Sequence, residues 1–223
     1  MPVKFQLLLL LIGSRVAWAA EPASAPSPPT MTFTLTPANG LIYAQIWKDR
    51  GTVAQGLSHD HVLRATEWQG QVRFDVRAIS QCQVRFSVVV NGLRSDDPEL
   101  RKRVGLPGEL SESQRRSVEE HLREPNQLNA AAFPTITFVA SGCRGRGASF
   151  GTIDVDGVLK IAGKEKKVSL PMRFEVNAGA LAAEGSLVVE HSDFGIKPYS
   201  ALLGAVKNGE DIKISIALGK FSD

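Results

Sequence analysis

The sequence has little of the features that assign a protein to a specialised class. Only 2 of its 223 residues are cysteine, which excludes a disulfide-dense miniprotein, and aromatic residues make up 7%. Lys and Arg number 26 against 23 Asp and Glu, so the formal charge of +3 is too small to indicate the concentrated basic face that nucleic acid requires. We therefore expect no nucleic-acid partner.

The sequence also lacks an apolar run long enough to cross a bilayer as a helix, which needs about 20 residues. Its one candidate, residues 5–12, follows Lys4 and precedes the small-x-small sequence Ala17-Trp18-Ala19. This pattern predicts that residues 1–19 are a cleavable signal peptide and that the mature protein is periplasmic or secreted, without a transmembrane segment. Its removal lowers the formal charge from +3 to +1, so charge indicates no partner.

The stretch that follows the expected signal peptide is rich in Pro and Ser. Such a composition cannot build a core, so we expect residues 20–30 to form an extended leader. Residues 31–223 are then left as one domain.

Alternation of apolar and polar residues dominates this domain, which is typical of half-buried strands. The clearest run places Val84, Phe86, Val88 and Val90 on one face, and eight or nine such segments follow one another. A meander of this kind closes most simply into a barrel. The pattern therefore predicts an all-β fold, an antiparallel lipocalin-like barrel of eight strands or slightly more.

One connection departs from the β pattern. Within residues 92–133, the segment Pro107–Leu122 predicts a single short helix, with Ser111 or Ser113 as its N-cap. This helix either caps one end of the barrel or is a solvated surface helix, and its charge content does not decide between them.

The inward-facing positions are almost free of charge, so any ligand should be apolar and elongated. Alternation alone leaves open whether the interior is filled by its own side chains or holds one small ligand. The lining positions that we expect are Phe74, Phe86, Val88, Ile136, Phe138, Leu170, Met172, Phe174 and Val189.

Three histidines are expected near a polar end of this interior. His59 and His61 lie two apart, so on a strand they point to the same side, and His191 shares the parity of inward Val189. They either hydrogen-bond the head group of a ligand, for instance the carbonyls of a quinone, or supply an incomplete metal site. The second interpretation describes a metal-binding or redox-associated periplasmic protein.

Motifs of catalysis are missing. The sequence has no Gly-x-Ser-x-Gly elbow, no Gly-rich phosphate loop and no paired catalytic carboxylates. Ser58 and His59 are adjacent and would face opposite ways on a strand, so they do not form part of a triad. We expect a protein that is not an enzyme and that requires no cofactor.

The two cysteines lie in segments that follow one another in the predicted sheet. Export to an oxidising compartment favours a disulfide between Cys82 and Cys143. Direct opposition of the two residues would pair inward Phe86 with Val139 and invert one face, unless a bulge near Gly142 shifts the register. The sequence therefore leaves open whether the two cysteines form a disulfide or remain free thiols.

Several segments, taken in order, resemble the YceI-like, polyisoprenoid-binding family of exported lipocalin-like barrels. The matching pieces are Gly70 to Asp75, His121-Leu122 with Phe133 to Phe138, Gly157 to Gly163, Val168 to Pro171, Ser192 to Ile196, and Asp211 to Leu218. The resemblance covers roughly Met31 to Leu218. It implies a barrel around a long apolar cavity that holds an isoprenoid chain, without catalytic machinery common to the fold.

The sequence departs from the common family pattern in three places. Ser58-His59-Asp60-His61 replaces a single His, His191 stands where Arg is common, and the segment from Gly92 to Glu120 is longer than usual. We therefore expect a binding protein for an isoprenoid-type lipid, a polyprenyl or quinone chain, that sequesters or transports it. A membrane redox or lipid-processing complex is the partner that this interpretation leaves open.

Overall fold

The computed structural model describes residues 30–52, 58–75, 77–146 and 150–221. The expected signal peptide, residues 1–19, and all but the last residue of the expected leader, 20–30, lie outside these ranges. In the part of the chain that is described, no helix has the length and apolar character needed to cross a membrane.

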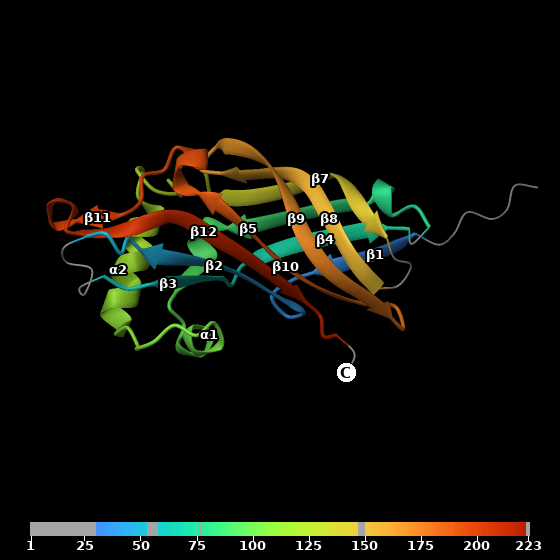
Figure 1. The fold of residues 1–223 in the computed structure, drawn as a ribbon, viewed down its shortest axis with the longest axis horizontal. Helices are drawn as coiled ribbons and strands as arrows, with labels where there is room; N and C mark the ends of the chain where they lie inside the picture. Colours follow the sequence, from blue (N-terminus) through green and yellow to red (C-terminus); the bar gives the residue numbers. More distant parts are fainter. Residues whose placement is uncertain (1–29, 53–57, 76, 147–149, 222–223) are drawn as a thin grey trace, which may run out of the picture.

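Antiparallel strands and two helices make up the described chain (Figure 1). The strands are β1 (Met31–Leu35), β2 (Gly40–Lys48), β3 (His61–Ala65), β4 (Trp68–Phe74), β5 (Gln83–Val89), β6 (Leu93–Ser95), β7 (Thr135–Arg146), β8 (Phe150–Ile161), β9 (Lys164–Asn177), β10 (Ala180–Glu190), β11 (Ser200–Ala201) and β12 (Val206–Leu218). The helices are α1 (Pro98–Arg103) and α2 (Glu112–Arg123). The sheet order is β1-β4-β5-β7-β8-β9-β10-β12-β2-β3-β6, and β11 pairs with the start of β12.

The curled sheet closes because three of its long segments are bent in the middle, so that each of the three is divided into two strands. β1 continues into β2, β3 into β4, and β5 into β6. Because neighbouring segments are antiparallel, the first half of one pairs with the second half of the next: β1 with β4, β2 with β3, β3 with β6 and β4 with β5. The backbone bonds Thr66 N to Gly92 O and Val89 N to Glu67 O continue the pairing across the bend between β3 and β4. β12 pairs with β2 and completes a circuit of eight segments. The predicted antiparallel, lipocalin-like barrel of about eight strands is confirmed.

The expectation of a single helix between β6 and β7 was wrong, because the connection contains two. α2 begins at the predicted N-cap Ser111, whose hydroxyl accepts from Gln114 N in a capping box. α1 has only six residues and no apolar periodicity, so the alternation analysis missed it. Its signal was Asp97 before Pro98, since Asp97 accepts from Leu100 N and Pro favours the first helical position.

The helical connection fills a gap in the side of the barrel. β6 pairs only with β3 among the described strands, so the sheet does not continue from β6 to β7. α2 lies along this end of the barrel (Figure 1), and Glu119 Oε1 accepts a hydrogen bond of 3.0 Å from Ser95 N at the end of β6. The helix therefore packs on the barrel beside β6 and is more than a solvated surface helix, although none of its residues is fully buried.

The structure joins Cys82 to Cys143, with their Cα atoms 5.8 Å apart. β5 and β7 pair so that Phe86 lies opposite Phe138, and the inward-facing residues of both strands therefore point to the same side of the sheet. The register of β7 against β8 shifts between Ala140 and Gly142. This irregularity lies at the position where a bulge was needed to bring the two cysteines together.

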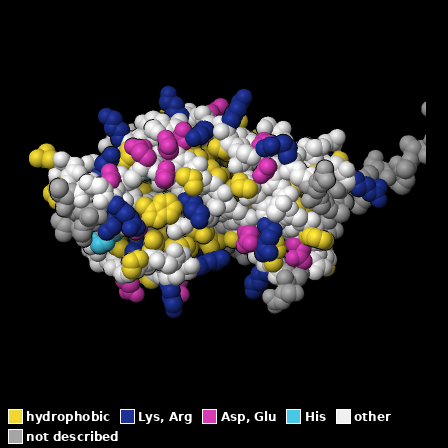
Figure 2. All heavy atoms as spheres, viewed as in Figure 1, with side chains coloured by type: hydrophobic (Ala, Val, Ile, Leu, Met, Phe, Trp, Pro, Cys, Tyr) yellow, Lys and Arg dark blue, Asp and Glu magenta, His cyan; other side chains and the backbone are white. Residues whose placement is uncertain are grey.

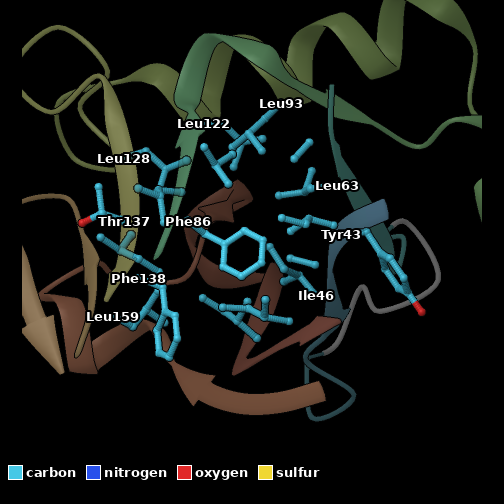
Figure 3. Close-up of a pocket in the computed structure, with 18 of the residues that line it drawn as sticks. Tyr43, Ile46, Leu63, Phe86, Leu93, Leu122, Leu128, Thr137, Phe138 and Leu159 are labelled. Atoms are coloured by element: carbon cyan, nitrogen blue, oxygen red, sulfur yellow. The ribbon is translucent and has the colours of Figure 1, made fainter. Parts of the chain in front are cut away.

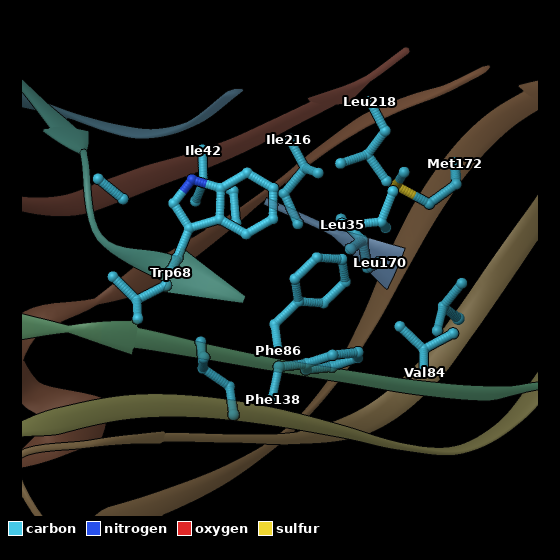
Figure 4. Packing of buried hydrophobic residues seen from close by; sticks show 14 of the residues in the cluster. Leu35, Ile42, Trp68, Val84, Phe86, Phe138, Leu170, Met172, Ile216 and Leu218 are labelled. Carbon is cyan, nitrogen blue, oxygen red and sulfur yellow. The ribbon is translucent and has the colours of Figure 1, made fainter. Parts of the chain in front are cut away.

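The core lies inside the barrel and is rich in aromatic side chains (Figure 4). Phe86 lies at its centre, 6.0 Å from Trp68 between ring centroids. Gly70 permits this packing, because a Cβ at that position would collide with the Phe86 ring. On the face shown in Figure 2, basic and acidic side chains are intermixed, in keeping with the near balance of charge.

Candidate functional site

The interior of the barrel contains three adjoining hollows. The central cavity has a volume of about 140 Å³, well above the roughly 10–15 Å³ that one water needs. The inner cavity, of about 50 Å³, shares Phe86 and Ile216 with it. The mouth, of about 230 Å³, shares Leu63 and His191 with the central cavity. The three hollows therefore follow one another along the barrel, and we call the central and inner cavities together the apolar hollow.

The central cavity is almost entirely apolar. Inward side chains of β2, β3, β5, β7, β8 and β12 line it, as alternation along these strands requires. Leu122 of α2 and the following Leu128 close it from the side of the helical connection, with Phe86 projecting into its middle (Figure 3). The helical connection therefore supplies part of the lining and is not only a cover.

Eight of the nine expected apolar lining residues border a cavity. Those at the central cavity are Phe86, Val88, Ile136 and Phe138, and those at the inner cavity are Phe74, Phe86, Leu170, Met172 and Phe174. Val189 borders neither; it is 2% exposed and packs within the hydrophobic core.

All four histidines of the protein border the mouth. His61 begins β3, so His59 precedes the strand and is exposed, contrary to the expectation that both lie on one strand. His191 follows β10 in a short 3-10 turn, is buried, and borders both the central cavity and the mouth. The ring of His121 packs against Tyr199 with 4.9 Å between centroids; sequence reasoning used His121 for the family resemblance but not as a site residue.

A buried carboxylate, Asp96, positions His61. Its Oδ2 lies 2.7 Å from His61 Nδ1 and accepts from Ser95 Oγ, while its Oδ1 accepts from Arg101 Nη1 at 2.6 Å and from Val62 N. Burial alone would raise the pKa of Asp96, but the hydrogen bonds from His61, Val62 and Ser95 and the charge of His61 hold that pKa below its usual range.

Two histidines present a fixed ring nitrogen to the mouth. His61 Nδ1 is held by Asp96, and His191 Nδ1 lies 2.9 Å from the backbone oxygen of Glu210. Because Nδ1 is occupied in each ring, Nε2 is the nitrogen left for a ligand. An imidazole Nε2 accepts or donates a hydrogen bond according to its protonation, so the pair suits a polar head group at the end of an apolar chain.

The alternative metal site gains no support from the geometry. Across the described residues, no group of three or more His, Cys, Asp or Glu side chains is arranged to hold a metal ion. His59, His61 and His191 border one hollow, but they do not form a compact ligand set.

The solved structures that resemble this fold include the following two. One is BcnA of Burkholderia cenocepacia, with a TM-score of 0.61 and 17% identity, covering 82% of this chain and 98% of that chain. The other is a polyisoprenoid binding domain from Saccharophagus degradans implicated in plant cell wall breakdown, with a TM-score of 0.56 and 9% identity, covering 85% of this chain and 97% of that chain. At such identities the similarity shows the fold alone.

A comparison with curated proteins finds no match. The model of the YceI-like domain, in contrast, matches residues 33–219, which run from β1 to just beyond β12. The matched stretch includes every strand that lines the three hollows, together with the helical connection. The chain belongs to the YceI-like family.

Proposed function

We propose that this protein binds an isoprenoid-type lipid, a polyprenyl or quinone chain, in its barrel, and sequesters or transports it. The observation that carries the proposal is the elongated apolar hollow that ends at a mouth bordered by four histidines. A structural relative, the Saccharophagus degradans domain, is described as polyisoprenoid binding, which supports the same ligand class.

Burial of the lipid's apolar chain supplies the binding affinity. Each CH₂ group removed from water contributes about 0.8 kcal/mol, so a few isoprene units outweigh the cost of association without specific polar contacts. The central and inner cavities take the apolar chain, and the mouth takes the head group. A quinone head group suits His61 and His191, because protonated or suitably tautomeric imidazoles donate to its carbonyl oxygens.

The proposal extends to the location of the protein and to its partners. An expected signal peptide at residues 1–19 supports export to the periplasm or to the medium. An exported carrier of isoprenoid lipids would exchange its cargo with a membrane redox or lipid-processing complex. No catalytic step is part of this proposal.

A matched pair of variants tests it. Val88 borders the central cavity, whereas Val139 on the neighbouring strand β7 is 46% exposed. Val88→Phe adds a ring to the cavity, and Val139→Phe adds the same ring outside it. After purification of the full chain, organic extraction and mass spectrometry should find an apolar lipid in the wild type and in Val139→Phe, and far less in Val88→Phe.

A control for folding and a direct uptake assay complete the experiment. Thermal unfolding of each variant shows whether it folds, since overpacking a core costs about 1–3 kcal/mol. The proposal fails if the wild type contains no lipid and also takes up neither a polyprenol nor ubiquinone from detergent micelles.

A further inference from the structure

A loop beside the mouth exposes two adjacent leucines. Leu202 and Leu203 form the turn between β11 and β12, and their side chains are 66% and 109% exposed. This turn projects at the left end of the molecule in Figure 1. Among the large hydrophobic side chains of the described chain, Leu203 is the most exposed. We call Leu202 and Leu203 the leucine tip.

The backbone of the leucine tip is strained as well as exposed. Leu202 and Leu203 have φ values of 50° and 55°, in the left-handed region that bulky side chains rarely adopt. Residues held in such conformations concentrate at functional sites, where other interactions offset the strain. Neither burial nor favourable backbone geometry accounts for two leucines at this position, which points to a contact outside the protein.

The leucine tip stands on the rim of the mouth. Tyr199 and Val206, which flank the turn in sequence, both border the mouth. Pairing of Ser200 with Lys207 and of Ala201 with Val206 holds the turn at this rim. A surface that received the leucine tip would therefore face the opening of the apolar hollow.

Basic side chains gather on the same rim. Lys48 lies opposite Asn208, a residue of the mouth, in the sheet. The backbone oxygen of Lys207 accepts a hydrogen bond from Asp49 N, and exposed Arg50 follows Asp49 in the chain. Lys197 is exposed just before Tyr199. The neighbouring acids are Asp49, which lies 4.0 Å from Lys207 Nζ, Asp60 and Glu210, so the four basic side chains outnumber the acids by one, and this small positive balance is compatible with anionic phospholipids.

We propose that the leucine tip inserts into the surface of a phospholipid bilayer and so turns the mouth toward the membrane. A protein partner fits less well, because a specific interface buries roughly 800 Å² on each side and two residues on a convex turn offer only a small area. A bilayer, in contrast, receives a narrow apolar projection flanked by basic groups. Docking rests on the proposed function only in that a lipid would then pass between membrane and cavity.

Vesicle flotation of the full chain tests the docking. We expect the wild type to float with vesicles of phosphatidylethanolamine and phosphatidylglycerol at 3:1, and less with phosphatidylcholine alone or in high salt. The double variant Leu202→Ser/Leu203→Ser should lower the bound fraction by at least about tenfold, because two apolar side chains are lost. Leu202→Phe/Leu203→Phe should retain binding.

The matched control is Phe150→Ser. Phe150 is 74% exposed and begins β8, which runs past the inner cavity before it reaches the central one, so it lies at the end away from the mouth. This variant should float like the wild type. The proposal is overturned if the wild type does not float, if the leucine double variant floats equally well, or if Phe150→Ser loses as much binding.

A second readout separates docking from cargo binding. Organic extraction of the same preparations reports the lipid in the cavity independently of flotation. Tip-dependent flotation of a protein that holds and accepts no lipid supports docking and refutes the proposed function. If the protein holds lipid but the wild type and the leucine double variant float equally well, docking is refuted and the proposed function is supported.

Discussion

Replacement of Asp96 by Asn should destabilise the barrel strongly, although the two side chains have almost the same shape. Asp96 is completely buried and faces Arg101, whose side chain is 4% exposed, at 2.6 Å. Asn keeps the volume and tolerates the left-handed φ of 54°, so only the charge and one acceptor change. Loss of one partner from a buried pair costs about 3–5 kcal/mol, because the other charge stays buried.

The assay is urea unfolding of the full chain at pH 7, followed by tryptophan fluorescence. We expect Asp96→Asn to lower the free energy of unfolding by about 3 kcal/mol or more, a large part of the roughly 5–15 kcal/mol typical of a domain. Glu112→Gln is the control, since the Arg116–Glu112 pair is exposed on α2 and contributes about 0.3–0.5 kcal/mol.

The pH dependence adds a second check. The folded state lowers the pKa of Asp96 below the unfolded value of 3.8. Its ionised form therefore stabilises the protein above about pH 4, and that contribution is lost as the pH falls through the folded pKa. The difference between wild type and Asp96→Asn should shrink in acid. A difference below about 1 kcal/mol at pH 7, or one that is independent of pH, would refute the role given to Asp96.

Three further predictions concern stability and are measured by denaturant or thermal unfolding. Replacement of Cys82 and Cys143 by Ser should cost about 4 kcal/mol, because the disulfide closes a loop with a sequence separation of 61, and equal stability would contradict it. Gly185→Ala should lower the free energy of unfolding by about 1–3 kcal/mol, because the new Cβ collides with the backbone oxygen of Pro171. An unchanged unfolding midpoint would show that β9 moves away from the new Cβ without a cost in stability. Leu203→Gly should raise stability by about 1 kcal/mol by relieving a φ of 55°, and a loss would mean that the leucine side chain packs.

Much of the barrel could be predicted because strand alternation is local. Val84, Phe86 and Val88 face inward on β5 as the pattern indicates. The bends between paired halves were not predictable, since they depend on how distant strands meet. The dipeptide Asn208-Gly209 is typical of a turn, but both residues lie within β12, where the register shifts before Ile212. Pairing with β2 and β11 overrides the local turn preference there.

The apolar lining of the site was predictable from the sequence, but the contacts of its histidines were not. Parity along the strands indicated which apolar residues face the interior, and it placed His191 inward. The contact of His61 with Asp96 was not predictable, because 35 residues separate them and only the pairing of β3 with β6 brings them together. The place of His121 at the mouth was not predictable for the same reason, since the sequence did not indicate where α2 packs on the barrel.

The central claim, that the barrel holds an isoprenoid chain, is tested most directly by the affinity of the full chain for polyprenols of increasing length. Each added isoprene unit buries further apolar surface at about 0.8 kcal/mol per CH₂, so the dissociation constant should fall steeply until the central and inner cavities are filled. Beyond that length the affinity should stay level, and Val88→Phe should reach the plateau with a shorter chain. An affinity that does not change with chain length would contradict the account.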